Sequence, residues 1–175
     1  MKKMLICFLF IVSIKTANTQ DNVFYEDVLT TENKSLSQSQ VFTKASEWLV
    51  YSFYSTKNPV FFSNEKTGRI IGNGSFQVSI PQGVNGNTTP MGHVSFVISI
   101  FCKDGKSRLV FSSVTHDAEA SGFGSGGNLL SIHPVSDSLG LSDKNWKKIQ
   151  EETTKSFKGI SQALLAYLNA TEKDW

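Results

Sequence analysis

The stretch from Gly68 to Ile80, GRIIGNGSFQVSI, constrains the fold more than any other part of the chain. Its even positions are apolar or glycine, and its odd positions are polar apart from Ile71. Because successive side chains of a strand point to opposite faces, this alternation predicts a long strand with one buried face and one solvated face. Gly72 and Gly74 fall on the buried face, where their missing side chains leave room for aromatic rings from a helix.

Other segments have the composition and alternation of strands. Strands are predicted at residues 22–31, 60–63, 93–102 and 106–116. In the first of them, Val23, Tyr25 and Val28 are the expected apolar points. Asp104-Gly105 is a strong signal for a two-residue hairpin turn between the last two strands. Residues 81–92 and 118–140 are rich in Gly, Asn, Ser and Pro, so both are predicted to be long loops.

Two segments repeat apolar side chains at the three- and four-residue spacing of amphipathic helices. The first covers residues 38–54 and follows Ser35 or Ser37, either of which can cap the helix by accepting from free N–H groups. The second covers residues 143–168, follows Ser142, and has a long apolar stripe: Trp146, Ile149, Thr153, Phe157, Ile160, Leu164 and Leu168. This order of elements predicts an α+β domain, with an antiparallel sheet of four to five strands and two helices packed on one face.

Residues 1–19 have the features of a secretory signal peptide. A basic start, Met1-Lys2-Lys3, precedes an apolar run at residues 4–14, and small and polar residues then lead to a cleavage site expected after Thr19. The run is shorter than the roughly 20 residues that span a bilayer, so an uncleaved anchor is the less favoured alternative. We therefore expect an exported chain, with a single domain at residues 20–175 and no transmembrane span after cleavage.

Charge and cysteine content narrow the classes of partner. Without Lys2, Lys3 and Lys15, the 17 basic residues fall to 14, against 15 acidic ones. A nearly neutral chain has no overall electrostatic attraction to nucleic acid or to anionic lipid, so neither is expected as a partner. After removal of Cys7, Cys102 is the remaining cysteine. Its place on the apolar face of a strand indicates a buried thiol rather than an intermolecular disulfide.

Several short strings together resemble one bacterial family. They are Ala45-x-x-Trp48, KTGRIIGNG at residues 66–74, Gly92-His93-Val94, Thr115-His116 and Trp146-Lys147-Lys148-Ile149. With the signal peptide, this combination is similar to an exported bacterial domain-of-unknown-function family that has a TATA-box-binding-protein-like (TBP-like) fold and occurs in Gram-negative bacteria. The resemblance covers about residues 22–168. It implies that fold and a periplasmic or cell-envelope location. It implies no activity, cofactor or catalytic residue, and the fold name does not imply DNA binding.

Two histidines are the candidates for metal chemistry. Counting outward from a two-residue turn at Asp104-Gly105 places His93 opposite His116, on the face away from the core. Cross-strand Cβ atoms lie roughly 4.5–5.5 Å apart, so the two imidazoles could share a metal ion with Asp117 or Glu119 as a third ligand. The alternative is two strand-end histidines on a half-solvated face, because two histidines without a fixed third ligand are weak evidence for a metal site. A bulge in the hairpin would also break the pairing.

The solvated face of the sheet is the candidate for binding. In the predicted register it holds Val97, Ser99 and Ser112 beside the two histidines, together with Val110 and Val114. We expect an exported, non-enzymatic module that binds a protein or small ligand through this face or the long loops. The alternatives are a metal-assisted hydrolase centred on His93 and His116, and an ordinary solvated sheet face with scattered valines.

The remaining motifs favour structural roles. Gly122 to Gly127 contains a G-x-G-x-x-G string, but it lacks the strand before and the helix after that a dinucleotide site requires, so no cofactor is expected. His133 lies in the irregular region with no evident partner. Phe101 and Arg108 are opposite in the predicted register, and an Arg over a Phe ring contributes about 0.5–1 kcal/mol at an exposed site.

Overall fold

The alternating segments pair into one antiparallel sheet in the computed structural model of the protein, which describes residues 23–32, 35–53, 59–82, 87–118, 125–135 and 141–170. Its order is β1-β5-β4-β3-β2, and β6 pairs with β5. The elements in chain order are β1 (Val23–Thr30), α1 (Gln38–Ser52), β2 (Val60–Asn64), β3 (Arg69–Gln82), β4 (Asn87–Lys103), β5 (Lys106–Asp117), β6 (Gly127–Asn128) and α2 (Asp143–Asn169). The predicted α+β class is confirmed, and the short β6 adds a sixth strand. The predicted signal peptide lies outside the described residues.

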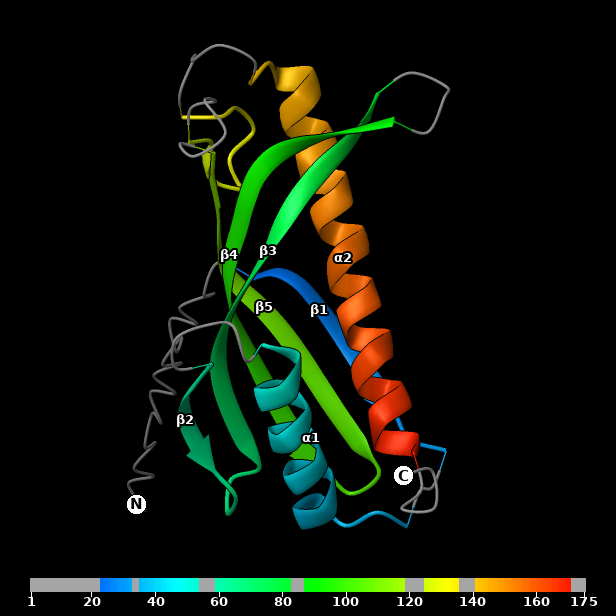
Figure 1. Cartoon of the computed structure of the whole chain (residues 1–175). Coiled ribbons are helices and arrows are strands. Elements are labelled where there is room, and N and C mark those ends of the chain that lie inside the picture. The colour runs from blue at the N-terminus through cyan, green and yellow to red at the C-terminus, as the bar shows by residue number, and fades with distance from the viewer. Residues whose placement is uncertain are drawn as a thin grey trace, which may run out of the picture.

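Both helices pack on the same face of the sheet, in front of it in Figure 1. The alternation along β3 explains this sidedness, since Ile70, Val78 and Ile80 are at most 2% exposed and point toward the helices. At Gly74 an added Cβ would overlap the ring of Phe96 in β4 and lie 3.0 Å from that of Phe53 at the end of α1, so a strand ring fills most of the space predicted for helix rings. At Gly72 the group that fills the space is the backbone carbonyl of Pro59 rather than a ring.

The two helices begin at serine caps. At α1 the capping serine is Ser37, whose side chain accepts from the N–H of Gln40, while the Gln40 side chain accepts from the N–H of Ser37 at 2.9 Å. At α2 the cap is Ser142, as predicted. The apolar stripe of α2 is buried at every predicted position except Ile160, which is half-buried next to the buried Ser161.

The predicted loop at residues 81–92 is wrong. β3 continues to Gln82 and β4 begins at Asn87, so most of this segment is a hairpin arm, which bends across the N-terminal half of α2 in Figure 1. Ile80 and Met91 are buried in this arm. Pairing between the two strands, with a register shift between Gln77 and Ser79, outweighs the turn-forming composition of the segment.

In two strands the facing of side chains differs from the prediction. In β1, Tyr25 faces the core, and Val28 is three residues further on, so alternation places Val28 on the opposite face: it is 60% exposed, and Leu29 is buried instead. In β5 a bulge lies at Ser113, where φ is 51°: Val97 pairs with Ser112, but Ser95 pairs with Thr115. One extra residue on one strand moves every later side chain to the other face. Val114 is therefore buried, against the prediction that it lies on the solvated face.

Candidate binding face of the sheet

No described helix or strand covers the face of the sheet opposite α1 and α2, which we call the open face (Figure 1). Each strand contributes the side chains that alternate with its buried set. The open face includes Glu26 and Val28 of β1, Phe62 of β2, Arg69, Ile71, Asn73, Ser75 and Gln77 of β3, His93, Ser95, Val97, Ser99, Phe101 and Lys103 of β4, and Lys106, Arg108, Val110, Ser112 and Thr115 of β5.

Two arginines lie against one phenylalanine ring on this face. The Arg108 Cζ atom is 4.5 Å from the ring centroid of Phe101, and the Arg69 Cζ atom is 5.3 Å from it. The predicted contact between Arg108 and Phe101 is confirmed. Arg69 adds a second contact, because β3 pairs with β4 in the register that places Arg69 opposite Phe101. No local signal could have predicted this contact, since the loop between β3 and β4 does not define their register.

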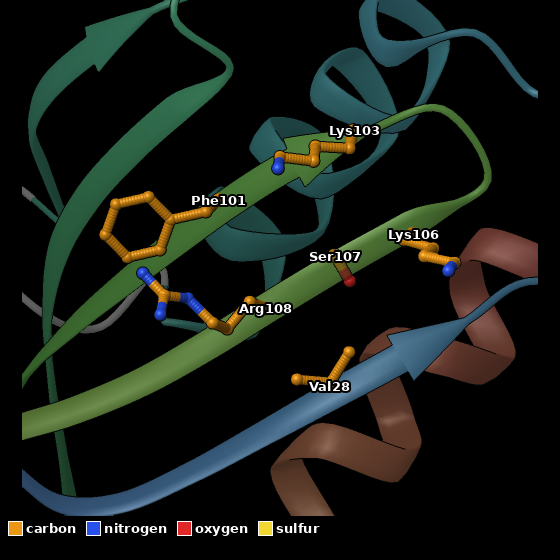
Figure 2. Close-up of a pocket in the computed structure, with 6 residues that line it drawn as sticks. All are labelled: Val28, Phe101, Lys103, Lys106, Ser107 and Arg108. Carbon is orange, nitrogen blue, oxygen red and sulfur yellow. The ribbon is translucent and has the colours of Figure 1, made fainter.

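A hollow of about 500 Å³ lies beside this ring, toward the Asp104-Gly105 turn (Figure 2). Lys103 and Lys106, which line it, are direct cross-strand partners on β4 and β5. Its other lining residues are Val28, Phe101, Ser107 and Arg108. In Figure 2 the helices lie behind the strands, which confirms that the hollow opens on the face away from them. None of its basic residues was predicted as a site, because scattered surface cations are common in any sequence.

A second hollow, of about 290 Å³, lies farther along the same face. Its lining residues are Asn73, Gly74, Ser75, Ser95, Phe96, Val97 and Ser113. Val97 was predicted as a binding residue. Ser99 and Ser112, also predicted, lie on the open face beside it, opposite Val110 and Val97 respectively. The structure thus brings these three residues together on the open face.

The two histidines do not meet. Beyond the bulge at Ser113, His116 pairs with Val94 and His93 pairs with Asp117, so the predicted pairing of His93 with His116 is wrong. The His93 side chain is exposed on the open face, whereas His116 is 1% exposed and points to the core. The described residues contain no group of three or more His, Cys, Asp or Glu side chains that could hold a metal ion, and Glu119 lies outside them.

The buried imidazole of His116 is held by the backbone. Its Nε2 atom lies 2.6 Å from the carbonyl oxygen of Met91, and its Nδ1 atom accepts from the N–H of Gly126 at 3.2 Å. Nε2 therefore carries the proton and donates to Met91. Burial lowers the pKa of His116, although the Met91 carbonyl and the charge of Asp117 oppose this. The neutral imidazole, edge-on to Trp146 at 5.7 Å, thus has a structural role in packing β5 against α2.

Family comparison agrees with the architecture. The family described as a domain of unknown function (DUF4468) with TBP-like fold matches residues 25–117, which is more than half of the 175 residues. The chain belongs to the DUF4468 family. The resemblance noted from the short strings is thereby confirmed. No curated protein matches the chain.

Two crystal structures show the same fold as this DUF4468 protein. A DUF4468 family protein from Bacteroides ovatus superimposes with a TM-score of 0.61 and 14% identity, over 85% of this chain and 86% of that one. A TBP-like protein from Parabacteroides distasonis gives a TM-score of 0.59 and 16% identity, over 82% of this chain and 90% of that one. At such low identity the similarity shows the fold alone, and that fold is TBP-like.

The remaining predicted residues of the DUF4468 chain have structural surroundings. Cys102 is a buried free thiol, and burial raises its pKa to about 12, so it carries no reactive thiolate. His133 does have a partner, since its Nδ1 atom lies 2.8 Å from the Asp143 carboxylate. Of the G-x-G-x-x-G string, Ser125, Gly126 and Gly127 are described, and a Cβ at Gly126 would overlap the Trp146 ring. No helix of the described residues is long and apolar enough to cross a membrane.

Proposed function

We propose that this DUF4468 protein is an exported, non-enzymatic binding module that contacts a protein or small ligand through the open face of its sheet. The observation that carries this proposal is the one-sided packing of the helices, which leaves two hollows on the opposite face. The basic and apolar start of the chain supports the proposal of export to the periplasm or cell envelope.

Exposed apolar groups on the open face favour binding. Val28 is 60% exposed and Phe62 is 41% exposed, and both lie among polar and charged side chains. An exposed apolar surface with a polar rim is typical of interaction sites. The hydrolase alternative depended on His93 and His116 sharing a face, and the register of β4 and β5 removes that geometric support.

Site-specific photocrosslinking tests the proposal. Benzoylphenylalanine is placed at Ser99 on the open face, and in a matched variant at Lys158, which is exposed on α2. After irradiation of cells that produce the protein, we expect an adduct from Ser99 and none from Lys158. A third variant at Ile132, which is 84% exposed before α2, tests binding through the loop instead. Adducts from Lys158 or Ile132 without one from Ser99 would show that the open face is not the binding surface.

A further inference from the structure

Four cations lie at one end of the open face, two against the Phe101 ring and two along the hollow beside it. They are Arg69, Lys103, Lys106 and Arg108, which we call the cationic cluster. We propose that the cationic cluster binds an acidic peptide segment of a partner protein. This inference rests on the proposed binding function and specifies the chemistry of its ligand.

The positive charge of the cationic cluster is poorly balanced. Lys103 and Lys106 are direct cross-strand partners, and two arginines share one ring. Like charges opposite each other destabilise a strand pair. Among the described residues one ion pair offsets this charge, between Arg108 and Glu26 at 3.6 Å, longer than the roughly 2.7–2.9 Å of a charge-assisted hydrogen bond. An incoming anion would relieve this repulsion. The excess of positive charge is local to the cluster, because the chain after residue 19 as a whole has 14 basic and 15 acidic residues.

The charged ends of the cluster are spread around the hollow. Figure 2 shows the amine of Lys103 and the guanidinium of Arg108 on one side of the hollow, while the amine of Lys106 points to the other side. A single small anion cannot contact all of these groups. A ligand with several separated anionic groups can.

Apolar surface lies between the cations. Val28, Phe101 and the aliphatic stems of the lysines and arginines line the hollow. A peptide that alternates carboxylates with apolar side chains can fill both parts of this surface, whereas a polysaccharide or nucleic acid backbone offers no aliphatic side chain. The ring contact also holds each guanidinium in place, and a guanidinium binds a carboxylate through two parallel hydrogen bonds.

The test measures fluorescence anisotropy of a short labelled peptide that alternates glutamate and valine. The comparison peptide has glutamine at every glutamate. We expect the purified protein to bind the glutamate peptide more tightly, and the difference to shrink as salt is raised because exposed charges are screened. Equal binding of the two peptides would overturn the proposal, as would tighter binding of a heparin oligosaccharide or of oligo(dT).

Variants of the cluster give changes in opposite directions. Each exposed charge pair increases affinity by at most about fivefold. The double variant Arg69→Gln/Arg108→Gln is therefore expected to bind the glutamate peptide about tenfold more weakly. Glu26→Gln removes the competing carboxylate and should tighten binding by about twofold to threefold. The control Lys147→Gln/Lys158→Gln removes the same charge from the exposed surface of α2 and should have no effect.

The two proposals fail in different ways. Loss of binding in the control as well as in the cluster variant would show that net charge alone drives binding and would overturn the acidic-peptide proposal. An adduct from benzoylphenylalanine at Ser99, together with no preference for the glutamate peptide, would overturn the ligand class and leave the open face as a binding surface. Failure of both measurements would remove the open face from consideration.

Discussion

Ser113 is the only non-glycine residue with a positive φ among those described, at 51°. It is exposed and occupies the bulge where β5 gains one residue relative to β4. A left-handed conformation costs an L-residue with a Cβ about 1–2 kcal/mol. The pairing of β5 on both of its edges compensates for this cost, and the bulge turns Val114 and His116 into the core.

Substitutions at Ser113 should follow backbone preference. Ser113→Val is expected to lower the free energy of unfolding by about 1–2 kcal/mol, because a β-branched side chain disfavours positive φ strongly. Ser113→Gly should stay within about 1 kcal/mol of the parent, since relief of strain is offset by the greater entropy of the unfolded chain. Urea denaturation measures both. Equal stability of the two variants would contradict the assigned bulge.

The buried imidazole of His116 predicts a loss of stability in mild acid. Its pKa is lowered in the folded state, so below its ordinary value of 6.5 the unfolded chain binds more protons than the folded one. Its contribution to stability is therefore complete above that pH and declines as the pH falls below it, toward the lowered folded pKa. Urea midpoints between about pH 7.5 and pH 5 should decrease accordingly.

Two variants separate His116 from the other titrating groups. His116→Gln should be less stable at neutral pH and lack this part of the pH dependence. His93→Gln, changed at an exposed position, should retain it. If His116→Gln kept the full decrease, another group would be responsible.

At the scale of elements, the two helices are joined at the C-terminal end of α2. The last turn of α2 contains no basic residue, and its final carbonyl groups lack intrahelical donors. Lys44 of α1 fills this role, since its Nζ atom donates to the carbonyls of Leu168 at 3.2 Å and Ala170 at 2.6 Å. A cation at this position also complements the negative end of the helix dipole.

Lys44→Met should therefore weaken the end of α2. We expect a loss of about 1–2 kcal/mol, because methionine keeps the aliphatic stem but leaves the carbonyls without the charged donor. Hydrogen exchange of the last turn of α2 should accelerate together with a lower melting temperature. Lys158→Met, at an exposed position in the middle of α2, is the control and should change neither quantity appreciably.

At the scale of the whole molecule, one ring of α2 connects most of the sheet. The Phe157 ring stacks on Phe111 at 4.2 Å and lies edge-on to Phe96 at 5.0 Å and to Phe76 at 5.9 Å. It also contacts two rings of β1, Phe24 at 5.7 Å and Tyr25 at 6.2 Å. Four strands thus meet α2 at a single buried side chain.

Phe157→Ala is expected to be the most damaging of these changes. Truncation of a buried phenylalanine costs about 3–5 kcal/mol, a large part of the roughly 5–15 kcal/mol that stabilises a domain. Phe157→Leu should cost less because it leaves a smaller cavity. Chemical denaturation compares both with Gln162→Ala, an exposed position of α2. A loss below about 1 kcal/mol for Phe157→Ala would show that α2 docks mainly elsewhere.

Periodicity in the sequence predicted the elements that depend on local order. The alternation from Gly68 to Ile80, the capping serines and the Asp104-Gly105 turn gave the sheet, the helices and the first rungs of the β4–β5 hairpin. The predictions from these features are correct because side-chain direction follows backbone geometry within a few residues. Val97, Ser99 and Ser112 were placed correctly for the same reason, since they lie between the turn and the bulge.

Only the tertiary structure decided the strand register far from the turn. It also decided the register between strands that no short loop connects. The bulge at Ser113 has no local sequence signal, yet it separated His93 from His116 and removed the predicted metal site. The cationic cluster likewise depends on β3, β4 and β5 lying in one register, which brings Arg69 and Arg108 to opposite sides of Phe101. The sequence by itself determined the α+β class and which face each regular strand buries. The sheet as a whole decided which side chains meet on the open face, because cross-strand contacts form only when distant segments pair.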